Sequence, residues 1–209
     1  MGEVIIRGRG GTSNHSHVPD EYQEVEYLQS SGTQYINTGV NTPSTRWGFE
    51  IDMTPLNPVG STGYAIFGQK LANSNEWHLN CWFGNAGYNG TLFLKGNRYP
   101  AKMTQNVRQK LLLKHGVFIN AEGAEYTVIN QAVGDLPVYI FCVNNNNAAA
   151  EFSSVRLYNF KIYDTTDALV SNLYPCYRIA DSVAGLWDAQ RSVFLTNSGS
   201  GSFTVGADV

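Results

Sequence analysis

Short runs in which apolar and polar residues alternate dominate the chain from residue 21 onward, and this period of two is what most constrains the fold. Examples are RWGFEIDM at 46–53, PVYIFCV at 137–143 and SSVRLYNFKIY at 153–163. Between such runs stand NTPS, NPVGSTG, NAGYNG, NAEG and NNNN, whose residues favour tight turns. No long stretch shows the period of 3.6 that is typical of a helix. The pattern predicts an all-β, antiparallel two-sheet sandwich.

The composition agrees with this prediction and excludes several classes of function. The 209 residues suit one domain, because all-β domains often reach ~200 to 250 residues. The formal net charge of -3 provides no basic surface for a nucleic-acid partner. No apolar run approaches the ~20 residues of a membrane-spanning helix, so no membrane partner is expected. The three cysteines, Cys81, Cys142 and Cys176, match no metal or redox spacing, and we expect buried free thiols and no cofactor.

The first 20 residues, MGEVIIRGRGGTSNHSHVPD, are rich in glycine and polar residues and bury little apolar surface on their own. We therefore expect an extended N-terminal arm at 1–20, which makes an attachment or subunit contact, followed by one sandwich domain at 21–209. The arm residues expected to make this contact are Ile5, Ile6, Arg7 and Arg9. The arm lacks the apolar segment of a secretion signal, so we expect synthesis in a reducing cytoplasm.

Three segments, taken together, point to a known family. They are EYLQSSGTQYINTG at 26–39, VRLYNFKIYDTTDALVSNLYPCYRIADSVAGLWD at 155–188 and SVFLTNSGSGSF at 192–203. In their order and motifs they resemble the laminin-G-like branch of the concanavalin A-like lectin/glucanase superfamily. The form that they resemble is found in tail and head-decoration proteins of phages of gut bacteria. The resemblance covers most of residues 21–205, and it implies a jelly roll whose terminal strands pair.

The same resemblance implies a virion protein that is made in the cytoplasm of the host bacterium. We expect a non-enzymatic capsid-decoration or head-fibre protein, whose arm binds other virion proteins of the capsid or tail. Its lectin-like domain would bind host-surface or environmental glycans, such as a bacterial surface polysaccharide. A tail-associated receptor-binding adhesin is the alternative, and a glycoside hydrolase is a third interpretation. Because one fold serves many functions, residues in a site must decide between them.

The strand RWGFEIDMTP bears on the hydrolase. Alternation places Glu50 and Asp52 on one face of this strand and its large apolar residues on the other. Laminarinase-type enzymes of the superfamily carry E-x-D-x-x-E, with the two glutamates as nucleophile and acid/base. Here the second glutamate position is Pro55, which cannot protonate a leaving group, whereas a retaining hydrolase needs both carboxyl groups. We therefore predict no catalytic residues and a charged, solvated strand face, with calcium or sugar binding by the carboxylates as the alternative.

The stretch EWHLNCWF at 76–83 is the richest polar and aromatic cluster. An extended chain places His78, Asn80 and Trp82 on one face, where an aromatic ring and hydrogen-bonding groups match the apolar face and hydroxyls of a sugar. Turn segments add a second exposed ring and amide groups. The candidate carbohydrate-binding residues are His78, Asn80, Trp82, Tyr88, Asn145 and Asn146. The alternative is that these residues are ordinary strand and turn positions.

His15 and His17 form an H-x-H pair in the arm. Around a trimer axis, three such pairs would bring six imidazoles together, which suits an octahedral metal site. The alternative is two solvated histidines in a polar segment. We expect a homo-oligomer, and the metal site requires that this homo-oligomer be a trimer.

Overall fold

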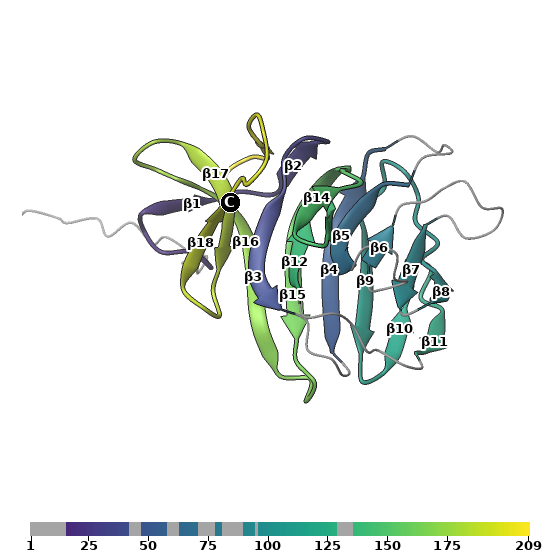
Figure 1. Cartoon of the computed structure of the whole chain (residues 1–209). Coiled ribbons are helices and arrows are strands. Elements are labelled where there is room, and N and C mark those ends of the chain that lie inside the picture. Colours follow the sequence, from purple (N-terminus) through teal and green to yellow (C-terminus); the bar gives the residue numbers. More distant parts are fainter. Residues whose placement is uncertain are drawn as a thin grey trace, which may run out of the picture.

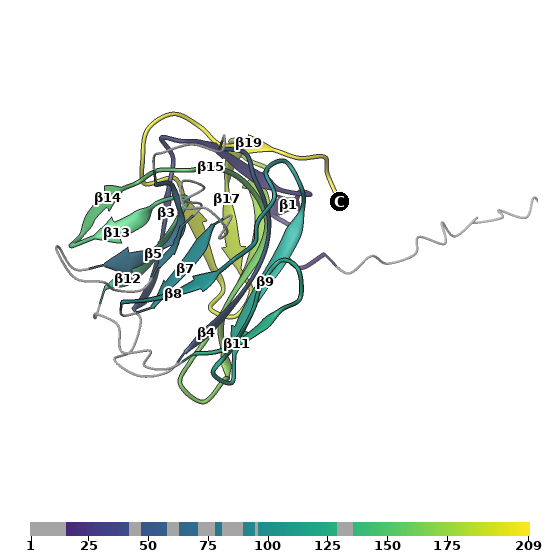
Figure 2. The same ribbon diagram turned by 90° about the vertical axis from the view of Figure 1, so that its right-hand side faces the viewer.

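The structure is a computed structural model, and it describes residues 16–41, 47–57, 63–70, 78–80, 90–94, 96–128 and 136–209. For residues 78–80 it describes the backbone alone. The described chain is all-β and forms two sheets that pack face to face, with the larger sheet curving around the smaller one (Figures 1 and 2). The predicted all-β sandwich of the jelly-roll class is confirmed. The arm residues Ile5, Ile6, Arg7 and Arg9 lie outside the described residues, as does His15.

The larger sheet has eleven strands. Eight of them follow the order β11 (Glu125–Thr127), β10 (Val117–Ile119), β9 (Gln109–Lys114), β4 (Gly48–Pro55), β15 (Ser154–Tyr163), β16 (Leu169–Arg178), β17 (Val183–Asp188) and β18 (Val193–Thr196). The other three are β1 (Tyr22–Glu24), which pairs with β16, β2 (Leu28–Ser31), which pairs with β15, and β19 (Thr204–Val205), which pairs with β2. The first and last segments of the described chain are therefore neighbours. A bridge between Val25 and Asp208 extends this contact.

The smaller sheet has eight strands. Six follow the order β14 (Ala148–Ala150), β13 (Val143–Asn145), β5 (Ala65–Lys70), β6 (His78–Asn80), β7 (Thr91–Leu94) and β8 (Asn97–Pro100). The remaining two are β12 (Pro137–Ile140), which pairs with β5, and β3 (Ile36–Asn41), which pairs with β12. All pairs in both sheets are antiparallel in the described ranges except β13 with β5.

Aromatic side chains from both sheets meet in the core. The ring of Phe67 in β5 lies 4.8 Å from that of Phe49 in β4 and 4.8 Å from that of Phe160 in β15. All three side chains are fully buried. The alternation in the sequence accounts for this arrangement, because Phe49, Ile51 and Met53 occupy the inward face of β4 as predicted. This shared core holds the two sheets together.

Pro175 does not end its strand, although a proline cannot donate a hydrogen bond to a sheet ladder. Strand β16 runs through it, and Pro175 pairs with Leu186 of β17. On the edge of β16 opposite β17, the pairing strand changes at this point from β15 to β1. The N–H that proline lacks is therefore not needed for a hydrogen bond in the ladder. The Pro175 carbonyl accepts a hydrogen bond from the Val25 N–H at 3.0 Å. The strand therefore continues beyond the sandwich.

The continuation of β16 creates an extension at one end of the molecule, on the left in Figure 1. We call this extension the flange, and it consists of β1, residues 174–178 of β16, β17 and β18. Cys176 of the flange and Cys142 of the sandwich are both buried free thiols, as predicted. Burial raises the pKa of Cys176 to about 12. Cys81 lies outside the described residues.

The described ranges form no helix with the length and apolarity needed to cross a bilayer.

Candidate functional site

Asp52 is covered by basic side chains rather than solvated as the sequence suggested. The Arg108 guanidinium donates to both carboxylate oxygens, with Nε–Oδ1 at 2.9 Å and Nη2–Oδ2 at 3.0 Å, and Lys110 Nζ lies 3.6 Å from Oδ2. Arg108 also lies 3.8 Å from the centre of the Tyr158 ring, so it covers the carboxylate and leaves Asp52 7% exposed. The hydrogen bond from Arg108 to Asp52 raises the pKa of Arg108. Both oxygens of Asp52 are therefore already engaged within the protein.

Glu50 is also engaged on the same outer face of β4. Lys161 Nζ lies 3.1 Å from Glu50 Oε1, and the Tyr163 hydroxyl donates to Oε2 at 3.3 Å. Burial raises the pKa of Tyr163 to about 12, and the charge of Glu50 adds to this effect. Both carboxylates of this outer face of β4, Glu50 and Asp52, are therefore held in a network of ion pairs. The second glutamate of the E-x-D-x-x-E hydrolase pattern is replaced by Pro55.

The predicted sugar-binding residues that can be placed belong to the smaller sheet. Asn145 of β13 pairs with Lys70 of β5, and His78 of β6 pairs with Gly68 of β5. The structure thus brings the backbones of these predicted residues to opposite sides of one strand. Asn80 lies in β6, whereas Trp82 and Tyr88 lie outside the described residues. Sugar binding by this group stays a prediction.

The NNNN segment forms the tight turn that its sequence predicts. Asn146 and Asn147 adopt φ values of 53° and 68°, in the left-handed region that asparagine tolerates. Asn144 stabilises the turn, because its Oδ1 accepts from the Asn147 N–H at 2.8 Å and its Nδ2 donates to the Pro137 carbonyl at 2.8 Å. Asn146 remains exposed at the tip of the turn.

The flange gathers a second group of aromatic residues, which the sequence pattern did not single out. Trp187 of β17 pairs with both Tyr174 of β16 and Phe194 of β18, so the three side chains share one face of the sheet. The Tyr22 ring of β1 lies 5.1 Å from Trp187 and 4.7 Å from Phe194. All four side chains are partly exposed. We call Tyr22, Tyr174, Trp187 and Phe194 the aromatic face.

Gly185 allows Phe194 to lie close to the strand beneath it. A Cβ atom at this position would lie 2.9 Å from two atoms of the Phe194 ring and 2.2 Å from the Leu195 carbonyl oxygen. A glycine in a strand often marks such a close approach. The sequence signal for the aromatic face was therefore a glycine two residues before Trp187, in the same strand. Such a glycine is not specific on its own, and it points to the aromatic face only when the register of β16, β17 and β18 is known.

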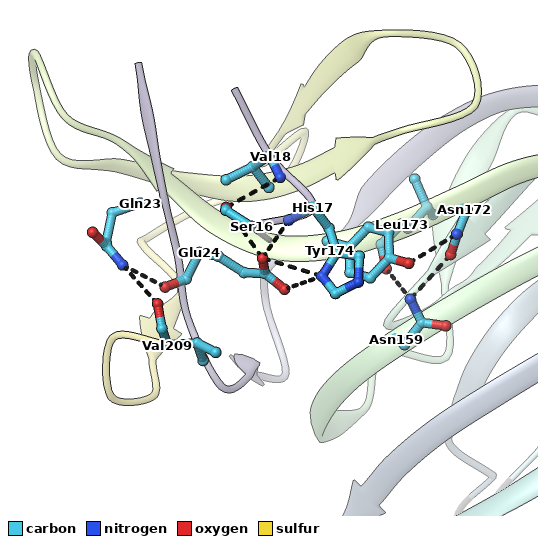
Figure 3. A network of polar contacts seen from close by, with 10 residues as sticks. All are labelled: Ser16, His17, Val18, Gln23, Glu24, Asn159, Asn172, Leu173, Tyr174 and Val209. Carbon is cyan, nitrogen blue, oxygen red and sulfur yellow. Dashed lines mark hydrogen bonds and ion pairs between the residues drawn. The ribbon is translucent and has the colours of Figure 1, made fainter. Parts of the chain in front are cut away.

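The segment before β1 supports Tyr174 from outside (Figure 3). The His17 ring stacks on the Tyr174 ring at a centroid distance of 4.2 Å and an interplanar angle of 7°. Glu24 fixes His17, since Oε1 lies 3.0 Å from His17 Nδ1 and Oε2 accepts from the His17 backbone N–H at 2.8 Å. On the other side, Asn172 Nδ2 donates to the Tyr174 hydroxyl at 3.0 Å. Tyr174 is therefore held in one orientation.

This arrangement also bears on the predicted histidine metal site. His17 already uses Nδ1 for its contact with Glu24, and its partner His15 lies outside the described residues. Among the side chains that the structure describes, no three metal-ligating residues form a group that could hold an ion. The H-x-H site of a trimer stays a prediction.

Asp188, the last residue of the G-L-W-D segment, anchors the flange to the sandwich. Its buried carboxylate accepts hydrogen bonds from Ser171 Oγ at 2.6 Å, from Arg191 Nε at 2.7 Å, and from the backbone N–H groups of Asn172, Gln190 and Arg191. Arg191 Nη2 in turn donates to the Thr38 carbonyl of β3 at 2.7 Å. This one carboxylate thus connects both sheets at the base of the flange.

Comparisons with known proteins agree with the fold. No family model matches the chain, and no curated protein matches it. A similar solved structure is that of a proposed carbohydrate-binding protein from Bacteroides ovatus ATCC 8483, with a TM-score of 0.54 and 13% sequence identity. The match covers 87% of this chain and 60% of that protein, so this chain corresponds to less than two thirds of its length. At this identity the likeness shows a shared β-sandwich fold.

Proposed function

We propose that this chain is a non-enzymatic carbohydrate-binding domain and that the aromatic face is its sugar platform. The observation that carries the proposal is the partial exposure of four aromatic rings that lie together on one face of the flange. Aromatic side chains provide a large apolar surface at a small cost in conformational entropy, which suits the apolar face of a sugar ring. The proposed carbohydrate binding of the similar Bacteroides ovatus protein supports the same role.

The rigidity of the aromatic face adds support. A binding surface is effective when its side chains are held in place before the ligand arrives. Tyr174 is held by His17 and Asn172, and the Phe194 ring rests against Gly185. The absence of an enzymatic role is supported by Pro55 and by the ion pairs that engage Glu50 and Asp52.

The variant Trp187→Ala tests this function. We expect wild-type protein to bind glycans on an array of bacterial polysaccharides, and we expect the Kd of the variant to rise at least about tenfold, because the central ring of the platform is lost. The matched control is Tyr158→Ala, which removes a partly exposed ring from the outer face of the larger sheet. Circular dichroism would show that both variants fold. If Trp187→Ala still binds glycans and Tyr158→Ala does not, the aromatic face is not the sugar-binding surface. If the wild-type protein binds no glycan on the array, the proposed function is wrong.

We further propose that the domain belongs to a virion, as a capsid-decoration or head-fibre protein, with a tail adhesin as the alternative. The segments at 155–188 and 192–203 support this setting through their resemblance to phage virion proteins. In this proposal the first residues bind other virion proteins, and the sandwich displays the aromatic face to glycans.

Deletion of residues 2–15 tests the virion role. The truncated chain keeps Ser16, His17 and Val18, whose contacts with the flange the structure describes, so we expect it to fold. We expect it to be absent from purified particles that incorporate the full chain, as measured by quantitative immunoblotting. A map of intact particles would then distinguish head from tail. Normal incorporation of the truncated chain would contradict attachment through the arm.

A further inference from the structure

An open pocket of about 510 Å3 lies where β17 begins and β18 ends, in the two strands that also carry Trp187 and Phe194. One wall is the turn from Asp181 to Ala184 at the start of β17, and the other is the loop from Thr196 to Phe203 that follows β18. Its volume is in the range of small-molecule sites, which is ~300 to 1,000 Å3. Hydroxyl, amide and carboxylate groups line it together with the apolar side chains of Val183, Ala184 and Phe203.

The loop wall is rigid although it forms no strand. The Ser198 N–H donates to the Tyr35 carbonyl at 2.8 Å, and the Ser200 N–H donates to the Thr33 carbonyl at 3.1 Å. Asn197 closes the loop, since its Oδ1 accepts from the Gly199 N–H at 2.8 Å and its Nδ2 donates to the Gly201 carbonyl at 2.9 Å. A ligand therefore meets a wall that is already ordered, which reduces the entropy lost on binding.

Gly199 shows how closely this loop approaches the segment behind it. A Cβ atom at Gly199 would lie 2.2 Å from the Thr33 carbonyl oxygen, so any other residue would push the loop away. The T-N-S-G-S-G-S-F segment thus requires its glycine in order to build the pocket wall. This gives a physical reason for one of the motifs that characterise the sequence.

The turn wall presents an oriented carboxylate. Arg178 binds Asp181 in a bidentate manner, with Nε–Oδ1 at 3.0 Å and Nη2–Oδ2 at 2.7 Å, and the Val183 N–H donates to Oδ1 at 3.3 Å. The Arg178 contact lowers the pKa of Asp181, so the group stays an acceptor in neutral and mildly acidic solution. Oδ1 already accepts two of these hydrogen bonds, whereas Oδ2 accepts one and keeps a second lone pair for a ligand.

Arg178 also connects the pocket to the aromatic face. Its guanidinium carbon lies 5.8 Å from the centre of the Phe194 ring while its nitrogens bind Asp181. Thr196, which lines the pocket, stands two positions after Phe194 in β18. An extended ligand can therefore contact the rings and enter the pocket at the same time.

We propose that this pocket binds one neutral sugar residue of a glycan that also stacks on the aromatic face, with Asp181 accepting hydrogen bonds from sugar hydroxyls. This inference rests on the proposed function and adds a second subsite to it. Asp181 is the sole charged residue among the described lining residues, and it is paired with Arg178, so this lining offers no cation for the carboxylate of a uronic acid or another anionic sugar. The hydroxyls of Ser182, Thr196 and Ser202 supply further donors and acceptors.

The test uses the full chain and isothermal titration with named probes. These are cellohexaose, laminarihexaose, mannohexaose and xylohexaose as neutral ligands, and an oligogalacturonate as the anionic ligand. We expect at least one neutral probe to bind more tightly than the oligogalacturonate. In Asp181→Asn we expect the Kd for that probe to rise about tenfold, because hydrogen bonds to charged groups contribute most. Asp164→Asn is the matched control, since Asp164 is likewise an exposed turn aspartate whose pKa is lowered by its hydrogen bonds with Thr166.

A second pair of variants tests the pocket by shape alone. Ser202→Trp places a large side chain in the pocket, and we expect it to weaken binding as well. Ser200→Trp changes the same loop at a residue outside the pocket lining, and we expect it to bind as the wild type does. Unchanged binding in both Asp181→Asn and Ser202→Trp, with loss in Trp187→Ala, would overturn the pocket and leave the proposed function standing. Preference for the oligogalacturonate would overturn the neutral-sugar assignment, and a wild type that binds no probe would overturn both.

Discussion

Replacing Asp188 with alanine is expected to lower the free energy of unfolding by about 3–5 kcal/mol, the range found when one partner of a buried charged network is removed. Asp188 is fully buried, and its loss would leave the Ser171 hydroxyl and the Asn172 N–H without their acceptor. It would also release Arg191, which connects this carboxylate to β3. Urea unfolding followed by tryptophan fluorescence would measure the change.

Two variants make the Asp188 result specific. Asp188→Asn keeps one acceptor oxygen and should lose less stability than Asp188→Ala, because some of the hydrogen bonds survive. Asp181→Asn changes an exposed aspartate in the turn that connects β16 and β17 of the flange, and it should unfold at nearly the same urea concentration as the wild type. If Asp188→Ala unfolds at the same urea concentration as the wild type, Asp188 does not anchor the flange.

Replacing Phe160 with alanine should cost about 3–5 kcal/mol of stability, because it removes a buried ring and leaves a cavity. The Phe160 ring lies 4.8 Å from Phe67 and 6.5 Å from Phe49, so its loss would loosen the contact between the two sheets. The matched control is Phe152→Ala, which removes a partly exposed ring located 6.1 Å from Tyr35. In thermal and urea unfolding, Phe160→Ala should be much less stable than Phe152→Ala. Equal losses would show that the core between the sheets is not centred on Phe160.

Local patterning in the sequence was sufficient to predict the sandwich and the faces of its strands. The alternation around Phe49 assigned the inward face of β4, and the glycines and asparagines marked the turns. These properties depend on residues that are close in the sequence, which is why a single sequence reveals them. The Asn146 and Asn147 turn is one example, since left-handed backbone is a local preference.

Strand pairing between distant segments could not be predicted in the same way. Tyr22 reaches the aromatic face because β1 pairs with the end of β16, and that pairing depends on where β15 leaves β16. The course of the chain through Pro175 follows from the same change of partner, whereas proline alone suggests a turn. The aromatic face could therefore be recognised only from the register of the strands, although each of its residues lies at an ordinary strand position.

The resemblance to a family directed attention to motifs that the structure shows to be structural. Asp188 of the G-L-W-D segment holds the base of the flange, and Asn197 and Gly199 shape the loop of the T-N-S-G-S-G-S-F segment. These residues keep surfaces in place, while the candidate ligand-binding groups are their neighbours Trp187, Asp181 and Ser202. The same two segments thus contain residues that build a surface, such as Asp188 and Gly199, and candidate ligand-binding residues, such as Trp187 and Ser202.

In the proposed attachment through the first residues, the position of His17 would limit how far the domain can stand from its anchor. His17 lies against Tyr174, and the Val209 N–H donates to the Glu24 carbonyl at 3.1 Å, so both ends of the described chain meet at the flange. Fifteen residues precede Ser16, and a chain of that length spans at most roughly 50 Å. An anchor at the first residue would therefore keep His17, and with it the aromatic face, within roughly 50 Å of the anchoring surface. Glycans thicker than the gap would have to approach the flange from the side.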